Sequence, residues 1–134
     1  MKLKAKSYLF DTHAHLNFTA YKNDVDEVIK RTLEGGVFVV NVGSQYSTSK
    51  RAVEMAQHYE TGVWAAVGLH PIHVDKATRK SLSLHPLPKG EGVGGEGEFF
   101  DYEKYLELAK NPKVVAIGEM GLDYHHFMEG DNVE

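Results

Sequence analysis

Two histidines near the start of the chain have a spacing that suits metal binding. His13 and His15 are separated by one residue in the sequence Asp-Thr-His-Ala-His, which begins at Asp11. Residues i and i+2 of a strand point to the same face, so both imidazoles can approach one cation. Imidazole nitrogen suits zinc and other divalent transition metals, and Asp11 can bind the metal or orient one of the histidines. A pair of unliganded histidines on a half-exposed strand is the alternative that this short pattern leaves open.

The second candidate ligand is a carboxylate far along the chain. Glu119 lies in the sequence Gly-Glu-Met-Gly-Leu-Asp-Tyr, which follows an apolar run. The carboxyl ends of parallel strands gather at one edge of a sheet, so Glu119 and the two histidines are expected to face one site. A carboxylate can bridge two cations, as a two-metal phosphodiesterase requires. A solvated loop residue is the alternative for Glu119, and Asp123 and Tyr124 are interpreted as residues of the rim or of a turn.

A third motif is Gly-Leu-His-Pro, which contains His70 and is soon followed by His73. A histidine there can contact a phosphate or a substrate oxygen, and a structural role is the alternative. Asn41 and Gly43 end the second expected strand on the same side but have no distinctive chemistry. The remaining histidines are not assigned to the site: His58, His85, His125 and His126.

These residues must be held by strands and helices that alternate along the chain. Apolar runs predict strands within residues 8–16, 37–43 and 63–71 and from residue 114 onward. Between them, helical spacing predicts helices that begin at Asp24, Ser47 and Asp101 and end near residues 35–36, 61–62 and 111–112. This order predicts parallel βαβ units of the α/β class. The periodicity alone does not distinguish an open doubly wound sheet from a barrel.

Composition sets limits on the function. The chain has 134 residues, 42% of them hydrophobic and 25% charged, which is typical of one globular domain. Its net charge of -4 argues against a broad electrostatic grip on nucleic acid, so any nucleic acid would be held at a localised site. The absence of cysteine, of a signal segment and of a membrane-length apolar run predicts a soluble cytoplasmic protein.

One segment lacks both helical and strand periodicity. Residues 81–98 are rich in Gly and also contain Pro, which predicts a flexible insertion within the domain formed by residues 1–134. We interpret it as a surface excursion without chemistry of its own.

Four segments, taken together, resemble the TatD family of metal-dependent hydrolases. They are FDTHAHLNF, NVGSQYSTSKRAVEMA, AAVGLHPIHV and VVAIGEMGLDYHH, and the match that they mark extends over nearly the whole chain outside residues 81–98. The resemblance implies a TIM-like (β/α)₈ barrel that binds two divalent ions, Mg, Mn or Zn, and hydrolyses phosphodiester bonds in DNA, with exonuclease action expected. It also implies that His13, His15 and Glu119 bind metal and that His70 lies in the substrate pocket.

The sequence departs from this family in one respect. The family takes further metal ligands from later strands, together with an aspartate that activates water, and the chain ends at Glu134 before them. We therefore expect about the first four strands of the barrel, its N-terminal half, with an incomplete catalytic set. The expected partners are DNA and either a second copy of the chain or a C-terminal half.

Two alternatives to an active TatD-type nuclease remain open at this point. One is an inactive truncated fragment that binds metal weakly. The other is a phosphoesterase of the polymerase and histidinol phosphatase type, which also opens with an Asp-x-His-x-His pattern, although the segments around His70 and Glu119 argue against it.

Overall fold

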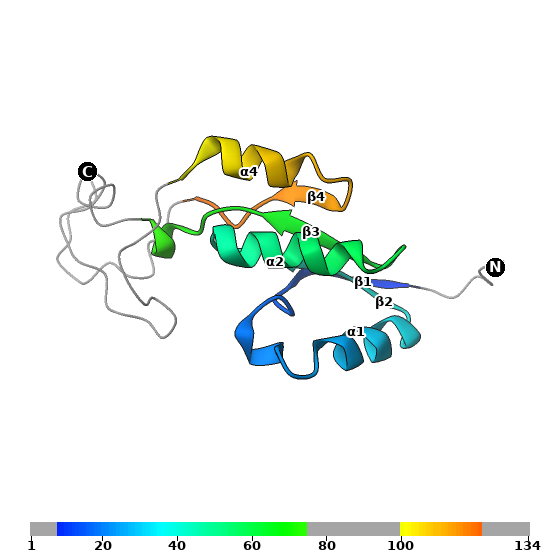
Figure 1. Cartoon of the computed structure of the whole chain (residues 1–134). Coiled ribbons are helices and arrows are strands. Elements are labelled where there is room, and N and C mark those ends of the chain that lie inside the picture. The colour runs from blue at the N-terminus through cyan, green and yellow to red at the C-terminus, as the bar shows by residue number, and fades with distance from the viewer. Residues whose placement is uncertain (1–7, 75–99, 122–134) are drawn as a thin grey trace.

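The computed structural model describes residues 8–74 and 100–121, in which strands and helices alternate (Figure 1). The strands are β1 (Leu9–Ala14), β2 (Val37–Val42), β3 (Val63–Val67) and β4 (Val114–Ile117). The α-helices are α1 (Val25–Glu34), α2 (Tyr46–Gln57) and α4 (Tyr102–Ala109), and two short 3₁₀ helices are η1 (Thr19–Tyr21) and η2 (Pro71–His73). The predicted insertion at residues 81–98 lies outside the described residues.

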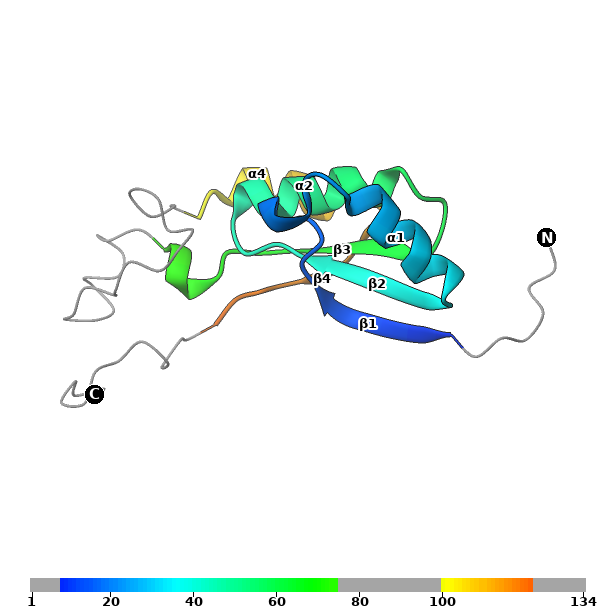
Figure 2. The ribbon, with the colours of Figure 1, turned by 90° about the horizontal axis from the view of Figure 1, so that it is seen from below.

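The four strands form one parallel sheet in the order β1-β2-β3-β4. In the described part of the chain, α1, α2 and α4 all lie on the same face of this sheet (Figure 2). A doubly wound sheet carries helices on both faces, whereas a barrel carries them only on its outer face. The α/β class is thus confirmed, and the choice that periodicity left open is answered in favour of part of a TIM-like barrel.

The hydrophobic core lies between the helices and the sheet. Branched and small side chains fill it because the two central strands are apolar runs and each helix presents an apolar stripe. The buried cluster contains Ile29, Val39, Ala52, Val53, Ala56, Val63, Ala65 and Val67. The edge strands differ, since every residue of β1 except Ala14 is exposed and three of the four residues of β4 are exposed.

Two of the three predicted helix starts are confirmed. Asp24 precedes α1, whose C-cap is Gly35, and Gly36 then adopts a positive φ of 80° that glycine permits without steric cost. Asp101 precedes α4, and its carboxylate accepts a hydrogen bond from the backbone N of Lys104 at 3.2 Å. Asp101 is thus a side-chain cap, whereas Asp24 occupies the N-cap position of α1 without a side-chain hydrogen bond.

The predicted start of α2 at Ser47 is wrong. The helix is capped two residues earlier, by Gln45, and forms a capping box with Thr48. The hydroxyl of Thr48 accepts hydrogen bonds from the backbone N of Gln45 at 3.1 Å and of Ser44 at 2.9 Å. Ser47 lies in the first turn, where its hydroxyl accepts from the Gln45 amide. A threonine that holds two backbone donors extends the helix beyond the serine that looked like its cap.

None of the helices in the described part of the chain combines the length and the apolar character that crossing a membrane requires.

Candidate metal centre

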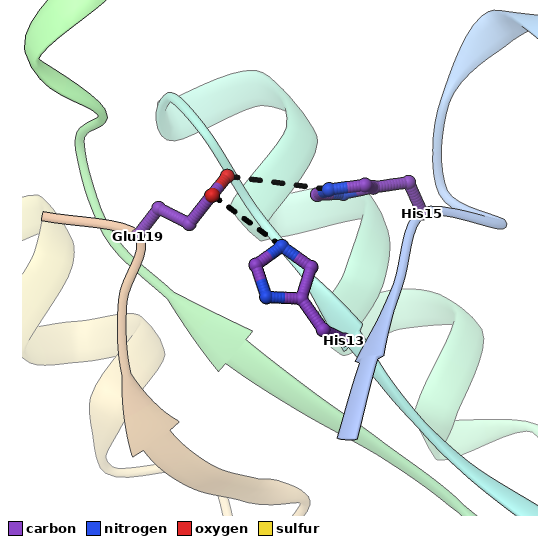
Figure 3. Close-up of side chains that lie close together, drawn as sticks. All are labelled: His13, His15 and Glu119. Carbon is purple, nitrogen blue, oxygen red and sulfur yellow. Dashed lines mark ion pairs between the residues drawn. The ribbon is translucent and has the colours of Figure 1, made fainter. Parts of the chain in front are cut away.

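Three side chains from opposite ends of the described chain come together at the carboxyl ends of the strands (Figure 3). His13 and His15 come from the end of β1, and Glu119 follows β4. One ligand atom from each of the three residues lies within 4.8 Å of the others. The structure thus brings together the two histidines and the carboxylate that the sequence singles out.

The distances between these ligand atoms suit a shared cation. His13 Nε2 lies 3.3 Å from Glu119 Oε1, and His15 Nε2 lies 4.0 Å from Glu119 Oε2. Two ligands that each lie about 2.1 Å from one ion can be separated by at most about 4.2 Å. Both histidine–carboxylate distances meet this limit, and the two carboxylate oxygens face different histidines. The spread of up to 4.8 Å within the group of three atoms is slightly wider, so all three would close in by a few tenths of an ångström around a single ion. Imidazole nitrogen and carboxylate oxygen together form a donor set that accommodates zinc, manganese or magnesium.

The ring of His15 is held in an orientation that leaves one nitrogen for a ligand. Its Nδ1 lies 3.0 Å from the backbone oxygen of Val42, and Phe18 stacks on the ring with centroids 4.4 Å apart. Because a carbonyl oxygen only accepts, Nδ1 must carry the proton of this hydrogen bond. In neutral His15 the lone pair is then on Nε2, the atom that faces Glu119. Such a backbone partner is common behind metal-binding histidines.

The register of β1 against β2 shifts within the segment that contains His13. Asp11 pairs with Val39 and Ala14 pairs with Asn41, so β1 has one residue more than β2 over this stretch. The shift interrupts the period-two alternation predicted from Asp11 onward, whereas His13 and His15 converge on one site as predicted. Ala14 packs against the core cluster on the helix side of the sheet. The two histidines that flank Ala14 accordingly point away from that side.

Asp11 does not belong to the three-residue group. Its carboxylate accepts a hydrogen bond from the backbone N of His13 at 3.0 Å. The role that this geometry supports is the stabilisation of the main chain at the bulge.

Glu119 reaches the histidines because the segment after β4 crosses the end of β3. Gly118 N donates to Val67 O of β3 at 2.9 Å, and Glu119 N donates to Gly43 O, beyond the end of β2, at 3.2 Å. The crossing passes over Gly68, where an added Cβ would lie 2.5 Å from Gly118 C. Only glycine leaves room for this close approach.

Near the carboxyl ends of β2 and β3 lie three fully buried polar side chains to which sequence reasoning gives no role: Asn17, Asn41 and Ser49. The Asn41 amide oxygen accepts from Leu16 N at 3.0 Å. The Asn17 amide donates to Val42 O at 3.1 Å and to Thr48 O at 2.9 Å. A polar residue within an apolar strand must be hydrogen-bonded when buried, so the asparagine in the run VFVVNVG was a usable signal.

His70 lies apart from the group of three ligand atoms. It precedes η2, where its Nδ1 accepts a hydrogen bond from the backbone N of Ile72 at 3.1 Å. Its own backbone N donates to Ser44 O at 2.8 Å. Neutral His70 therefore carries its ring proton on Nε2, the opposite arrangement to that of His15.

The other histidines and rim residues add nothing to this group among the described residues. His73 belongs to η2, and exposed His58 ends α2. The remaining residues considered from the sequence lie outside the described residues: His85, Asp123, Tyr124, His125 and His126.

Comparison with known proteins yields one family. The family model described as TatD related DNase matches residues 10–134. Among curated relatives, the uncharacterized metal-dependent hydrolase YabD of Bacillus subtilis (strain 168) is 40% identical over 118 residues, which are 87% of this chain and 38% of the relative.

Proteins named 3'-5' ssDNA/RNA exonuclease TatD are also similar. Those of Klebsiella pneumoniae (strain 342) and Erwinia tasmaniensis are 30% and 28% identical, each over 87% of this chain, which is 37% and 38% of the respective relative. The chain thus spans less than two-fifths of the length of the relatives it matches.

Proposed function

This chain belongs to the family of TatD-related DNases, and from that membership we propose that it forms part of a metal-dependent enzyme that hydrolyses phosphodiester bonds in single-stranded nucleic acid. The observation that carries the proposal is the convergence of His13, His15 and Glu119. Relatives named as ssDNA/RNA exonucleases support the substrate class and exonuclease action. Family membership favours this function over a phosphoesterase of the polymerase and histidinol phosphatase type.

In the proposed centre, three side chains of the chain would bind and orient the metal ions. His13 and His15 offer Nε2 atoms, and Glu119 offers one carboxylate oxygen toward each. Divalent cations bound there, two in the complete barrel, supply Lewis acidity toward a phosphodiester and make water a better nucleophile near neutral pH. The Glu119 carboxylate offsets part of the positive charge, and the Val42 carbonyl keeps the His15 lone pair directed at the site.

His70 is proposed to hold the substrate. Because its Nδ1 accepts from Ile72 N, its Nε2 presents an N–H, which is a donor suited to a phosphate oxygen. This role requires no change in protonation of the ring. The proposed role of His70 also differs from that of His15, whose Nε2 carries a lone pair suited to metal.

A second candidate function is metal binding without catalysis by the isolated chain. One observation favours it: the described residues bring only three candidate ligands together. In this case a second copy or a separate C-terminal half would complete the site. The water-activating aspartate expected from the family resemblance would then come from that partner.

The experiment that tests both functions measures nuclease activity of the purified chain on single-stranded DNA and RNA with Mn²⁺ or Mg²⁺. The test variant is the double substitution His13→Ala, His15→Ala. His58→Ala is the matched control, because it removes an exposed histidine at the end of α2. Size-exclusion chromatography of each preparation reports on self-association.

Metal-dependent activity that the double variant loses and the control keeps would support the nuclease function. Mn²⁺ binding without activity, lost in the same variant, would support the second candidate. Equal metal binding by the parent chain and the double variant would contradict both.

A further inference from the structure

One fully buried hydroxyl lies between α2 and the segment that follows β3, next to the glycines that the Glu119 main chain approaches. Ser49 is on α2, on the side that faces the sheet, and is fully buried. Its Oγ lies 3.2 Å from Gly68 N and 3.2 Å from Gly68 O. The hydroxyl therefore accepts from the amide of Gly68 and donates to its carbonyl, which ties α2 to the end of β3 at one residue.

Ser49 also fills the space that a side chain at Gly43 would need. A Cβ added to Gly43 would lie 2.2 Å from Ser49 Oγ, which is far inside contact distance. Three backbone segments thus pack around one hydroxyl with no side chain between them: the ends of β2 and β3 and the first half of α2. We call Gly43, Ser49 and Gly68 the glycine-serine junction.

The glycine-serine junction carries the main chain of Glu119. Gly43 O accepts from Glu119 N at 3.2 Å, and Gly68 lies so close to the crossing segment that an added Cβ would meet Glu119 O at 2.9 Å. Gly68 is hydrogen-bonded to Ser49, and Gly43 packs directly against the Ser49 hydroxyl while its own N donates to Ala66 O at 2.9 Å. A change in the position of Gly68 or Gly43 must therefore move the backbone from which the carboxylate extends.

We propose that Ser49 is a positioning residue that fixes the Glu119 carboxylate relative to His13 and His15, acting through the main chains of Gly43 and Gly68. The proposal rests on the metal-binding role proposed for Glu119. It assigns to the buried hydroxyl a function beyond stability. The candidate ligands come from opposite edges of the sheet, so their separation depends on a fixed point between those edges. The glycine-serine junction lies between them. Loss of partners behind a metal ligand weakens metal binding about 10- to 100-fold.

The test measures the Kd for Mn²⁺ and the visible absorption of bound Co²⁺ in the full 134-residue chain. Ser49→Ala removes the hydroxyl, and Ser47→Ala is its matched control, because Ser47 is exposed on the same helix. Glu119→Gln is the reference for a weakened carboxylate ligand. We expect Ser49→Ala to weaken Mn²⁺ binding about tenfold, with a Co²⁺ spectrum displaced toward that of Glu119→Gln. Ser47→Ala should bind within about twofold of the parent.

The Co²⁺ spectrum separates positioning from plain structural support, because a serine that only stabilises the fold would not change the ligands of the ion. Parent-like Mn²⁺ affinity and Co²⁺ spectrum in folded Ser49→Ala, with both altered in Glu119→Gln, would overturn the proposal and leave the metal site intact. Parent-like binding by Glu119→Gln would instead overturn the metal-binding role of Glu119.

Ser49→Cys covers the case in which Ser49→Ala does not fold. It keeps the approximate volume at the junction but has only a weak donor and a weak acceptor. Weaker Mn²⁺ binding by this variant is the expected result. Binding equal to that of the parent chain would overturn the proposal.

Discussion

The central strands and the edge strands of this sheet differ in burial and in the residues that they contribute to the candidate site. β2 and β3 are largely buried, and they support the site with backbone atoms and one buried amide. β1 and β4 are mostly exposed, yet the three candidate ligands lie at or just beyond their ends. The candidate ligands are thus placed by the strands that contribute least to the core, while the strands that form the core act as a supporting frame.

The two edges would be far apart in a simple sheet. Three spacings between neighbouring strands separate β1 from β4, roughly 14 Å in a flat arrangement. The distance of 3.3 Å between His13 and Glu119 is reached because the main chain after β4 turns across β3 toward β2. Backbone routing, rather than long side chains, closes the site.

The largest expected effect is the loss of stability when a core side chain is truncated. Ile29 of α1 is fully buried against the sheet, and Ile29→Ala should lower the free energy of unfolding by about 2–5 kcal/mol. Urea denaturation measures this loss. The Kd for Mn²⁺ of the folded fraction should stay within about twofold of the parent, because no ligand moves. A matching fall in metal affinity would contradict the division between frame and site.

Leu9→Ala is the control for that variant. Leu9 lies on β1 with 68% of its surface exposed, so its loss should change stability by no more than about 0.5 kcal/mol.

At the edge of the sheet we expect metal affinity to fall while stability stays nearly unchanged. Glu119→Ala should weaken Mn²⁺ binding at least about 100-fold, the upper end of what loss of a partner behind a ligand costs. Unfolding measured without metal should change little, since the carboxylate is partly exposed and lies outside the core. Calorimetric titration gives the affinity, with exposed Met120→Ala as the neighbouring control. Unchanged affinity in Glu119→Ala would remove this residue from the site.

Sequence reasoning succeeds where one residue's chemistry or one run's periodicity decides the outcome. The apolar runs of β2 and β3 predict buried strands, and the pairing of His13 with His15 and Glu119 follows from residue types and strand ends. It fails where several segments must meet. The bulge after Asp11 depends on pairing with β2, and the role of Thr48 in capping α2 depends on two backbone donors.

Ser49 shows the same limit most clearly. In the sequence it is an ordinary serine on a helix, and only the approach of Gly43 and Gly68 gives it partners.

A third variant tests whether the frame and the site are coupled. Asn41→Ala on β2 removes the acceptor of Leu16 N, directly after His15, and should cost about 1–3 kcal/mol of stability. It should also weaken Mn²⁺ binding, by less than tenfold, because the loop that carries His15 loosens.

Asn111→Ala is the comparison for that variant, since Asn111 accepts from Lys113 N just before β4 begins, at the opposite end of the strand from Glu119. It should lower stability and leave metal affinity unchanged. Equal effects of the two variants on metal affinity would show that the frame acts only through overall stability.

The smallest effect lies at the start of α4. The backbone N–H of Lys104 donates to Asp101 and holds the pKa of that carboxyl below its ordinary value of 3.8. Since the folded pKa is lowered, the stabilisation is complete above the ordinary pKa and is lost as the pH falls through the lowered value. Asp101→Ala should therefore reduce the melting temperature slightly at pH 7. This difference should shrink in acid, and a difference that persisted at the lowest pH would contradict the charged cap.

The candidate ligands lie at the first and last described strands, so binding of an ion depends on the order in which the strands assemble. A cation that joins His13 and His15 to Glu119 acts as a clasp across a long loop, and its stabilisation grows with its concentration relative to Kd. It can bind at full strength only after β4 has docked on β3. Mn²⁺ should consequently slow the detachment of β4 during unfolding, and a chelator should accelerate it, so occupancy of the centre reports that β1 to β4 are assembled.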